Sequence, residues 1–336
     1  MNLPKLNQGM LSANDPAAGQ ANRGGGPFGS FDIAVAKELL GKRAPQWIEA
    51  CSAQPPVAIV LGSGLGGLAD LISSPTSVPY GEIPGLATTT AAGHRGEFLL
   101  GWLAGAPVIA MAGRLHAYEG HSIDAVTRPM ALMASLEPRA VIVSCAAGGL
   151  NPRYEAGDLV LIDEHMSLLH GLLGFGNLTA DLPGQSQLSP SEHVQGQPIP
   201  ADSGAESEEK ALSTWPANRY GGPTCDERLA AIAMATSRRD EFRLHSGSYL
   251  AVTGPNYETR AECRMMRSWG FDLVGMSTVP ELVLASRAGL PTLAIAVVTN
   301  MAVPDAPQAA SHDDVLAVSS TAGVRLQSVV EAIAVC

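Results

Sequence analysis

The chain of 336 residues has little positive charge, few cysteines and no long apolar run. Lys and Arg number 21 against 32 Asp and Glu, and the formal net charge of −11 argues against nucleic acid or an anionic membrane as a partner. The five cysteines are odd in number and contain no CxxC pair, which suits neither a zinc site nor a disulfide scaffold. No apolar run of 18 residues and no signal-like segment occurs. We therefore expect a cytoplasmic protein without a metal site.

The composition is that of a globular protein with a substantial core, because 46% of the residues are hydrophobic and 16% are charged. Two stretches depart from it. Residues 1–30 contain few large apolar groups, so we expect a disordered N-terminal arm. Residues 183–213 are rich in Ser, Gln, Pro and Glu, and strand patterns resume after them. We expect one domain over residues 31–336 that carries a polar insertion at about 183–213.

Short apolar runs typical of buried strands alternate with helical segments. The expected strands are Val57–Leu61, Val108–Met111, Ala140–Cys145, Leu159–Ile162, Ser248–Thr253, Asp272–Met276 and Thr292–Thr299. The expected helices include Asp124–Leu136, with Ser122 as N-cap, Thr259–Trp269 and Pro280–Ala288. This alternation predicts an α/β fold, a mixed and mostly parallel sheet flanked by helices. Ligands bind at the carboxyl ends of the strands in such sheets.

A glycine-rich turn follows the first expected strand. Gly62, Gly64 and Gly67 form a G-x-G-x-x-G pattern, and Glu82 stands about 20 residues further on, as in dinucleotide-binding folds. The residues that follow contain prolines at 75, 79 and 84 and leave no room for a helix and a second apolar strand, so we reject that interpretation. A glycine-rich turn that opens a helix still offers backbone N–H groups to an anion, and Ser63 adds a hydroxyl there.

Polar side chains gather in the other loops that follow strands. They are His94 in AGHRGEF, Arg114, His116, Tyr118 and Glu119 in AGRLHAYEG, Glu258 in GPNYET, Ser277 in GMSTVPE, and Thr299 and Asn300 in VVTN. Each has an ordinary structural alternative: a satisfied histidine, a surface ion-pair partner for Arg114, a helix cap for Glu258, a turn residue for Asn300. Together they predict a site with donors for an oxyanion and separate amide and acid groups for a heterocycle.

Seven short motifs follow one another in a set order between Val57 and Asn300: GSGLG, GHRG, GRLHAYEG, AAGGLNP, GPNYET, GMSTVPE and TN. In this respect the chain resembles the purine nucleoside phosphorylase family, the trimeric type that also contains methylthioadenosine phosphorylase. The resemblance implies reversible cleavage of a purine nucleoside by inorganic phosphate to free base and (deoxy)ribose 1-phosphate. It also implies a homotrimer and phosphate as co-substrate, with no metal or organic cofactor.

The resemblance also assigns roles to residues. The phosphate ligands it implies are Ser63, His94, Arg114, His116, Ala146 and Ser277. The nucleoside-binding residues it implies are Tyr118, Met276 and His312 at the ribose and Tyr257, Glu258 and Asn300 at the purine. The residues it implies for catalysis are His116, Glu119, Glu258 and Asn300.

Glu258 and Asn300, two of the residues placed at the purine, indicate which base is used. Glu258 can accept from N1–H of a 6-oxopurine, and Asn300 can bond both N7 and O6, whereas 6-amino relatives have an Asp at the Asn300 position. We therefore expect inosine and guanosine as substrates. Methylthioadenosine phosphorylase and an inactive nucleoside-binding protein remain as alternatives.

The chain departs from the family pattern in three places. Met301 stands where a Lys often follows the TN pair, and Cys145 stands where an Asn is common. We interpret Cys145 as a tolerated core change. The third departure is the insertion at about 183–213. In the family this region lends an aromatic side chain to the ribose pocket of the neighbouring subunit, and either Phe175 or Tyr220 could supply it here.

Overall fold

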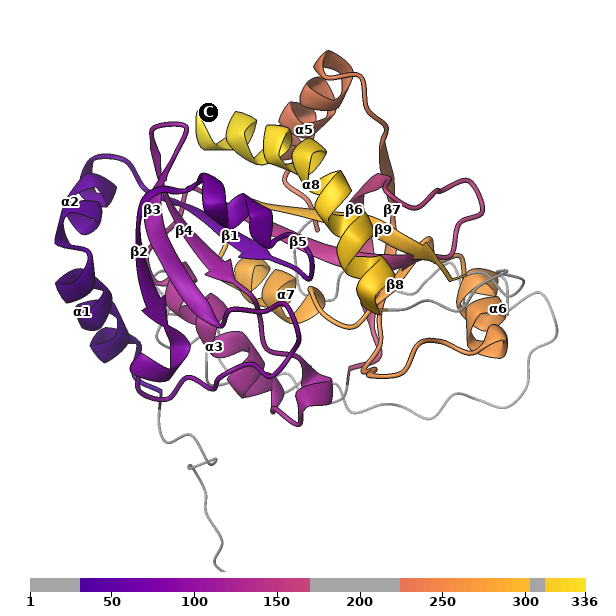
Figure 1. Cartoon of the computed structure of the whole chain (residues 1–336), viewed down its shortest axis with the longest axis horizontal. Coiled ribbons are helices and arrows are strands. Elements are labelled where there is room, and N and C mark those ends of the chain that lie inside the picture. The colour runs from indigo at the N-terminus through magenta and orange to yellow at the C-terminus, as the bar shows by residue number, and fades with distance from the viewer. Residues whose placement is uncertain (1–30, 170–223, 303–311) are drawn as a thin grey trace, which may run out of the picture.

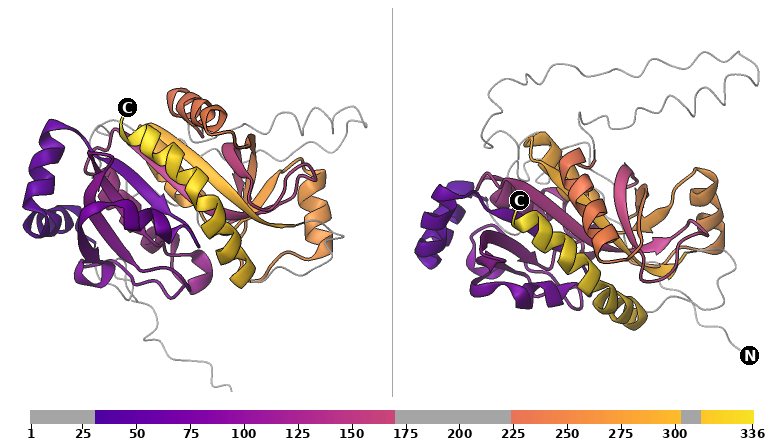
Figure 2. Two further views of the ribbon diagram at one scale, coloured as in Figure 1. Left: turned by 45° about the horizontal axis from the view of Figure 1, so that its top comes forward. Right: turned by 90° about the horizontal axis from the view of Figure 1, so that it is seen from above.

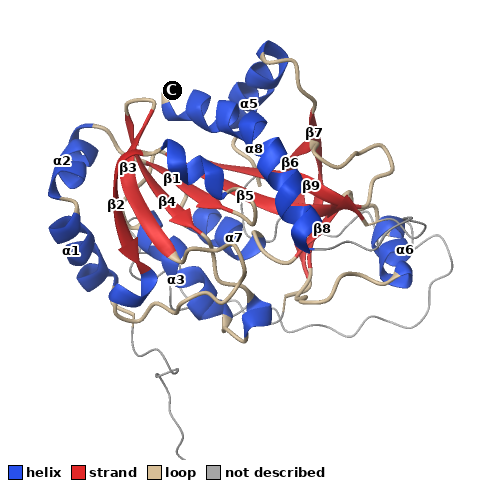
Figure 3. Cartoon of the chain, viewed as in Figure 1, coloured by secondary structure: helices blue, strands red, loops and turns tan. Residues whose placement is uncertain are grey.

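A nine-stranded mixed sheet runs through the centre of the molecule (Figures 1 and 3), with the strand order β2-β3-β4-β1-β5-β8-β7-β6-β9. The computed structural model describes residues 31–169, 224–302 and 312–336, with the side chains of 312 and 313 excepted. The strands are β1 (Val57–Leu61), β2 (Ser73–Pro79), β3 (Glu97–Leu103), β4 (Ala106–Ala112), β5 (Ala140–Gly149), β6 (Leu159–Ser167), β7 (Leu244–Ala251), β8 (Leu273–Gly275) and β9 (Thr292–Met301).

Helices cover both faces of the sheet (Figures 1 and 2). One face packs against α1 (Ile33–Arg43), α2 (Pro45–Ala53), α3 (Ile123–Ala134) and α7 (Val279–Arg287). The other packs against α5 (Glu227–Arg239), α8 (His312–Ala334) and the 3₁₀ helix η1 (Gly66–Leu71). The side chains of β1 alternate between these two cores: Ala58 and Val60 enter the first, and Val57, Ile59 and Leu61 the second. Two short 3₁₀ turns, η2 (Tyr80–Glu82) and η3 (Ala117–Glu119), precede and follow the β3–β4 hairpin.

The remaining helix, α6 (Arg260–Ser268), lies at the end of the molecule away from α1 and α2 (Figure 1). Thr259 is its N-cap and forms a capping box with Glu262, so Glu258 is not the cap of this helix. The predicted cap of α3 is confirmed, since the Ser122 hydroxyl accepts from the Ala125 amide at 3.2 Å.

Strand β5 connects the two halves of the sheet. Its first residues pair in parallel with β1, and its last two, Gly148 and Gly149, pair antiparallel with β8. Because β8 pairs with β7, β7 with β6, β6 with β9, and β9 with β5, these five strands close into a ring. The pairing of β5 with β9 shifts in register between Ala147 and Gly148, beyond Val143, the last residue of β5 that pairs with β1.

The predicted class, a single α/β domain with a mixed sheet between helices, is confirmed, and five of the nine strand pairings among the described residues are parallel. Two expectations need correction. The glycine-rich turn opens a six-residue 3₁₀ helix rather than an α-helix, so it has no substantial helix dipole. The sequence analysis also missed β2 and β3, which form an antiparallel pair at the sheet edge.

The expected arm (1–30), the polar insertion (183–213), Phe175 and Tyr220 lie outside the described residues. Among the helices that the structure describes, none is long and apolar enough to cross a membrane.

Candidate active site

A pocket lies where the loops after β1, β4, β7 and β8 meet the last residues of β5 and β9, at the carboxyl ends of these strands. It encloses about 690 Å³ of atom-free space, its open mouth included. The lining residues are Gly62, Ser63, Arg114, His116, Tyr118, Cys145, Ala146, Ala147, Gly148, Tyr257, Glu258, Val274, Gly275, Met276, Ser277, Thr299, Asn300 and Val315.

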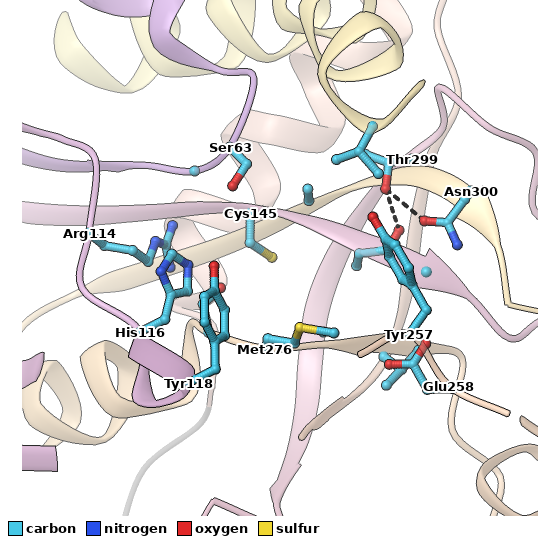
Figure 4. A pocket seen from close by; sticks show the side chains of 18 residues that line it. Ser63, Arg114, His116, Tyr118, Cys145, Tyr257, Glu258, Met276, Thr299 and Asn300 are labelled. Atoms are coloured by element: carbon cyan, nitrogen blue, oxygen red, sulfur yellow. Dashed lines mark hydrogen bonds between the residues drawn. The ribbon is translucent and has the colours of Figure 1, made fainter. Parts of the chain in front are cut away.

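Two groups of polar side chains lie on opposite sides of this pocket (Figure 4). Ser63, Arg114 and His116 are on one side, and Glu258 and Asn300 are on the other. The Met276 side chain lies between the two groups, with Tyr118 beside His116 and Tyr257 beside Glu258. A ligand that fills the pocket therefore meets cationic and hydroxyl donors at one end and an acid and an amide at the other.

His116 is held by Glu119 within the η3 turn. The Glu119 carboxylate accepts from the His116 amide at 2.8 Å and lies 3.0 Å from its Nδ1. The Thr90 hydroxyl donates to the same carboxylate at 2.8 Å. Burial acts to raise the pKa of Glu119, but hydrogen bonds from His116 and Thr90 outweigh it and hold that pKa well below its usual range. Glu119 is therefore a fixed anion, and because it occupies Nδ1, the Nε2 of His116 is the ring nitrogen left for a ligand.

His94 links the glycine-rich turn to the loop after β4. Its Nε2 lies 3.0 Å from the Ser63 hydroxyl, and its Nδ1 lies 2.9 Å from the Arg114 amide nitrogen. Burial, reinforced by the nearby His116, lowers the pKa of His94 to about 4. At neutral pH the His94 ring is thus uncharged and acts on the pocket through Ser63.

Arg114 is a buried cation, with 1% of its surface exposed. Its guanidinium donates to the Thr278 hydroxyl at 3.3 Å and to the Ser144 carbonyl, and its Nη1 lies 3.5 Å from the buried Glu281 carboxylate. These contacts were not foreseen from the sequence, although Thr278 and Glu281 both belong to the GMSTVPE motif.

The turn between β8 and α7 is strained. Thr278 has φ +76° and ψ −52°, a left-handed conformation that a β-branched residue rarely adopts. The neighbouring Ser277 hydroxyl lies 3.2 Å from that of Thr278, and the buried Tyr249 hydroxyl donates to the Ser277 carbonyl at 3.3 Å. The surrounding contacts therefore maintain a conformation that brings Ser277 to the pocket and Thr278 to Arg114.

The other side of the pocket carries Glu258 and Asn300. Burial raises the pKa of Glu258, and the charge of Glu262 adds to this effect. Asn300 lies near the end of β9, and its Oδ1 accepts from the Thr299 hydroxyl at 3.0 Å. With Oδ1 so held, the Nδ2 amide group is available as a donor. Asn300 is thus part of a strand and not a turn residue.

Glycines allow the backbone to approach closely around the pocket. A Cβ on Gly62 would lie 2.8 Å from the Ser144 carbonyl oxygen, and one on Gly149 would lie 2.9 Å from the Val298 side chain. The close packing of β1, β5 and β9 at this point therefore needs glycine. It places the backbone of Ala146 at the pocket, as the motif AAGG predicts.

Most of the predicted site residues line this one pocket, and two of those that the structure describes do not. His94 and Glu119 lie behind it and hold Ser63 and His116. His312 begins α8, and its side chain lies outside the described residues. Cys145 is a core residue with 1% exposure and also lines the pocket. Among the described residues, no three His, Cys, Asp or Glu side chains are grouped as a metal site would require.

Comparison with known proteins gives a consistent result. Residues 56–334 match the model of the Phosphorylase superfamily. Purine nucleoside phosphorylase 1 of Bacillus subtilis (strain 168) is 37% identical over 279 residues, which are 83% of this chain and 91% of that protein. A solved structure of a Schistosoma purine nucleoside phosphorylase with hypoxanthine is 33% identical, with a TM-score of 0.65, over 88% of this chain and 96% of that one. Another, of the Schistosoma mansoni enzyme with adenosine, is 34% identical, with a TM-score of 0.65, over 88% and 95%.

Proposed function

This chain belongs to the purine nucleoside phosphorylases of the phosphorylase superfamily, and we propose that it cleaves 6-oxopurine nucleosides, inosine and guanosine, with inorganic phosphate. It is an enzyme of the pentosyltransferase class. The proposed reaction is reversible and yields the free base and (deoxy)ribose 1-phosphate. The proposed site uses phosphate as co-substrate and no metal or organic cofactor.

One observation carries the proposal: the two polar groups of the pocket lie on opposite sides of Met276 (Figure 4). Phosphate is assigned to the side with Ser63, Arg114 and His116, together with Ser277 and the Ala146 backbone. A guanidinium fork and hydroxyl donors suit an oxyanion. The purine is assigned to the side with Tyr257, Glu258 and Asn300. The ribose then lies between them, beside Met276 and Tyr118, with His312 proposed at its 5′-hydroxyl.

The chemistry follows from charge. As the C1′–N9 bond breaks, its electron pair leaves with the purine, and positive charge develops on the ribosyl ring. A phosphate oxygen held below the ring stabilises that charge and then bonds to C1′. The departing purine takes up one proton, which balances the one that hydrogen phosphate loses on becoming ribose 1-phosphate. His116, oriented by Glu119, fixes the phosphate for this step. The site acts by positioning and electrostatic stabilisation, without a covalent enzyme intermediate.

The choice of base rests on Glu258 and Asn300. The solved relatives bind both hypoxanthine, a 6-oxopurine, and adenosine, a 6-aminopurine, so base preference has to be argued from this chain's own residues. An ionised Glu258 accepts from N1–H, which a 6-oxopurine has and adenine lacks. The Nδ2 group of Asn300 donates to O6, and its oxygen accepts from N7–H of the leaving base. Both contacts favour inosine and guanosine.

The experiment is chromatographic: purified protein is incubated with inosine, guanosine, adenosine or methylthioadenosine, each with and without phosphate. Release of hypoxanthine and guanine that requires phosphate, with adenosine intact, is the expected result. Cleavage without phosphate would contradict phosphorolysis, and cleavage of methylthioadenosine alone would contradict the proposed base pocket. The homotrimer that the family resemblance implies is tested on the same sample by its mass in solution.

A further inference from the structure

Arg114 is oriented by acceptors from three different elements. The Ser144 carbonyl belongs to β5, the Thr278 hydroxyl to the turn after β8, and the Glu281 carboxylate to the first turn of α7. Arg114, Thr278 and Glu281 are each at most 1% exposed. A guanidinium is planar and its five N–H groups point in fixed directions. Acceptors along one edge of the group therefore decide where the remaining N–H groups point.

The ion pair between Arg114 and Glu281 is incomplete. It consists of one contact of 3.5 Å, whereas a bidentate pair would have two shorter ones. The Nε of Arg114 and the Oε2 of Glu281 are both buried without a hydrogen-bond partner. Buried polar groups are nearly always paired, so these two atoms show that the ion pair leaves hydrogen-bonding capacity unused on both side chains. Glu281 thus holds the guanidinium without occupying all of its donors.

Glu281 is itself held firmly. It lies in the first turn of α7, where the helix dipole stabilises a carboxylate, and the preceding Pro280 and the strained Thr278 fix how the chain enters the helix. The conformation of the turn therefore sets the position of both Thr278 and Glu281. The same turn carries Ser277, a proposed phosphate ligand.

We propose that Glu281 and Thr278 are positioning residues for the anion: they fix the Arg114 guanidinium in the orientation that binds phosphate, without touching phosphate themselves. This rests on the proposed function, because it refines the phosphate side of that same site. Loss of either residue frees the guanidinium to rotate toward the remaining acceptors. The effect falls on phosphate affinity and leaves the purine side, formed by Glu258 and Asn300, unchanged.

The test compares isosteric substitutions with conservative ones. Glu281→Met removes both oxygens at similar volume, and Glu281→Gln retains one as an acceptor for Nη1. Thr278→Val removes the hydroxyl and keeps the β-branched shape, and Thr278→Ser retains the hydroxyl. Thr236→Val, at a threonine of 3% exposure on α5, is the matched control for loss of a buried hydroxyl. Initial rates are measured against phosphate at saturating inosine and against inosine at saturating phosphate.

We expect E281M and T278V to raise the KM for phosphate by about tenfold or more, the size expected for a lost hydrogen bond to a charged group. The KM for inosine stays within about twofold, since only one side of the pocket is changed. E281Q and T278S stay close to the unmodified protein, and T236V leaves both constants unchanged. Thr278→Val deletes a single hydroxyl and keeps the side-chain shape, so T278V tests the orientation of Arg114 even where E281M does not fold.

Three results would overturn the inference. One is an unchanged KM for phosphate in folded E281M and T278V, which would leave Glu281 and Thr278 with a structural role only. Another is a lower KM in both E281Q and E281M, which would mean that the carboxylate only repels the anion. The third is an equal rise in both KM values. Failure of the proposed function looks different, because the unmodified protein would then not cleave inosine with phosphate at all.

Discussion

The carboxylate of Glu119 accepts the backbone amide of His116 at 2.8 Å and lies 3.0 Å from its ring Nδ1. One acid three residues away thus sets both the backbone and the ring orientation of the histidine. The hydroxyls of Thr89 and Thr90 hold the same carboxylate from the loop before His94. His116 is therefore held in one orientation by the turn that carries it.

Replacing Glu119 with Gln should lower kcat by about 10²-fold, the size expected when a group that positions substrate is displaced. The amide presents N–H groups to donors from His116 and Thr90, so it cannot accept from all of them. Steady-state kinetics of the variant measure this effect. Glu82→Gln is the control, because that acid pairs with Arg43 on the surface. Equal kcat values for E119Q and E82Q would contradict the role of Glu119.

The pH dependence of stability should report the buried state of His94. Its pKa is about 4 in the folded protein and 6.5 ordinarily, so the unfolded state takes up a proton first as the pH falls. The stabilisation is complete above pH 6.5 and is lost between 6.5 and 4, an amount of about 3 kcal/mol. Denaturant unfolding at several pH values should show a shallower fall for His94→Gln.

His165 provides the matched comparison for that experiment. Burial also lowers its pKa to about 4, and it pairs with the Thr224 hydroxyl away from the pocket. The His165→Asn variant should lose its own share of the pH dependence. An H94Q variant whose unfolding follows pH as steeply as that of the unmodified protein would contradict the neutral, buried state of His94.

Gly64→Ala should destabilise the protein by about 1–3 kcal/mol, because residue 64 has φ +74° and a new Cβ would lie 2.5 Å from the Cβ of Ser319. The substitution should also raise the KM for phosphate, since Ser63 is the adjacent residue. Gly67→Ala is a control within the same motif, as a Cβ there meets nothing within 4 Å. Thermal unfolding of the two variants measures the difference, and equal melting temperatures would be inconsistent with this packing.

Replacing Asn300 with Asp should reverse the base preference. The carboxylate cannot donate to O6, so kcat/KM for inosine falls by about 10²-fold, the cost of one lost transition-state donor. The same carboxylate can accept from a 6-amino group, so activity on adenosine rises. Kinetics with both nucleosides test this, with Thr299→Ser as a control that keeps the hydroxyl bound to Asn300 Oδ1. An N300D variant that kept its preference for inosine would assign base selection to another residue.

The fold class and most of the pocket could be predicted because strand periodicity and loop motifs are local features of the sequence. The seven predicted strands all correspond to strands in the structure, with ends that shift by a few residues. Strand β2 was missed because it is an exposed edge strand that contains Pro75 and Pro79, without an apolar pattern. The 3₁₀ geometry of η1 was missed because glycine-rich turns are compatible with either helix type.

The network around Arg114 could not be predicted for a different reason. Arg114 and Glu281 are 167 residues apart, and only the tertiary structure brings the loop after β4 next to the first turn of α7. The alternative of a surface ion pair for Arg114 was wrong about exposure and right about pairing: the residue is buried and still contacts an acid. Sequence motifs indicated which residues matter, and the tertiary structure was needed to show which of them hold others in place.

The most direct test of the proposed function is the ratio of kcat/KM for inosine to that for adenosine. It is measured on the unmodified protein at saturating phosphate, with ribose 1-phosphate identified as the second product. We predict a ratio of about 10² or more, because Glu258 and Asn300 both lose a hydrogen bond with a 6-aminopurine. A ratio near one, or a ratio that favours adenosine, would contradict the proposed reading of the purine by these two residues.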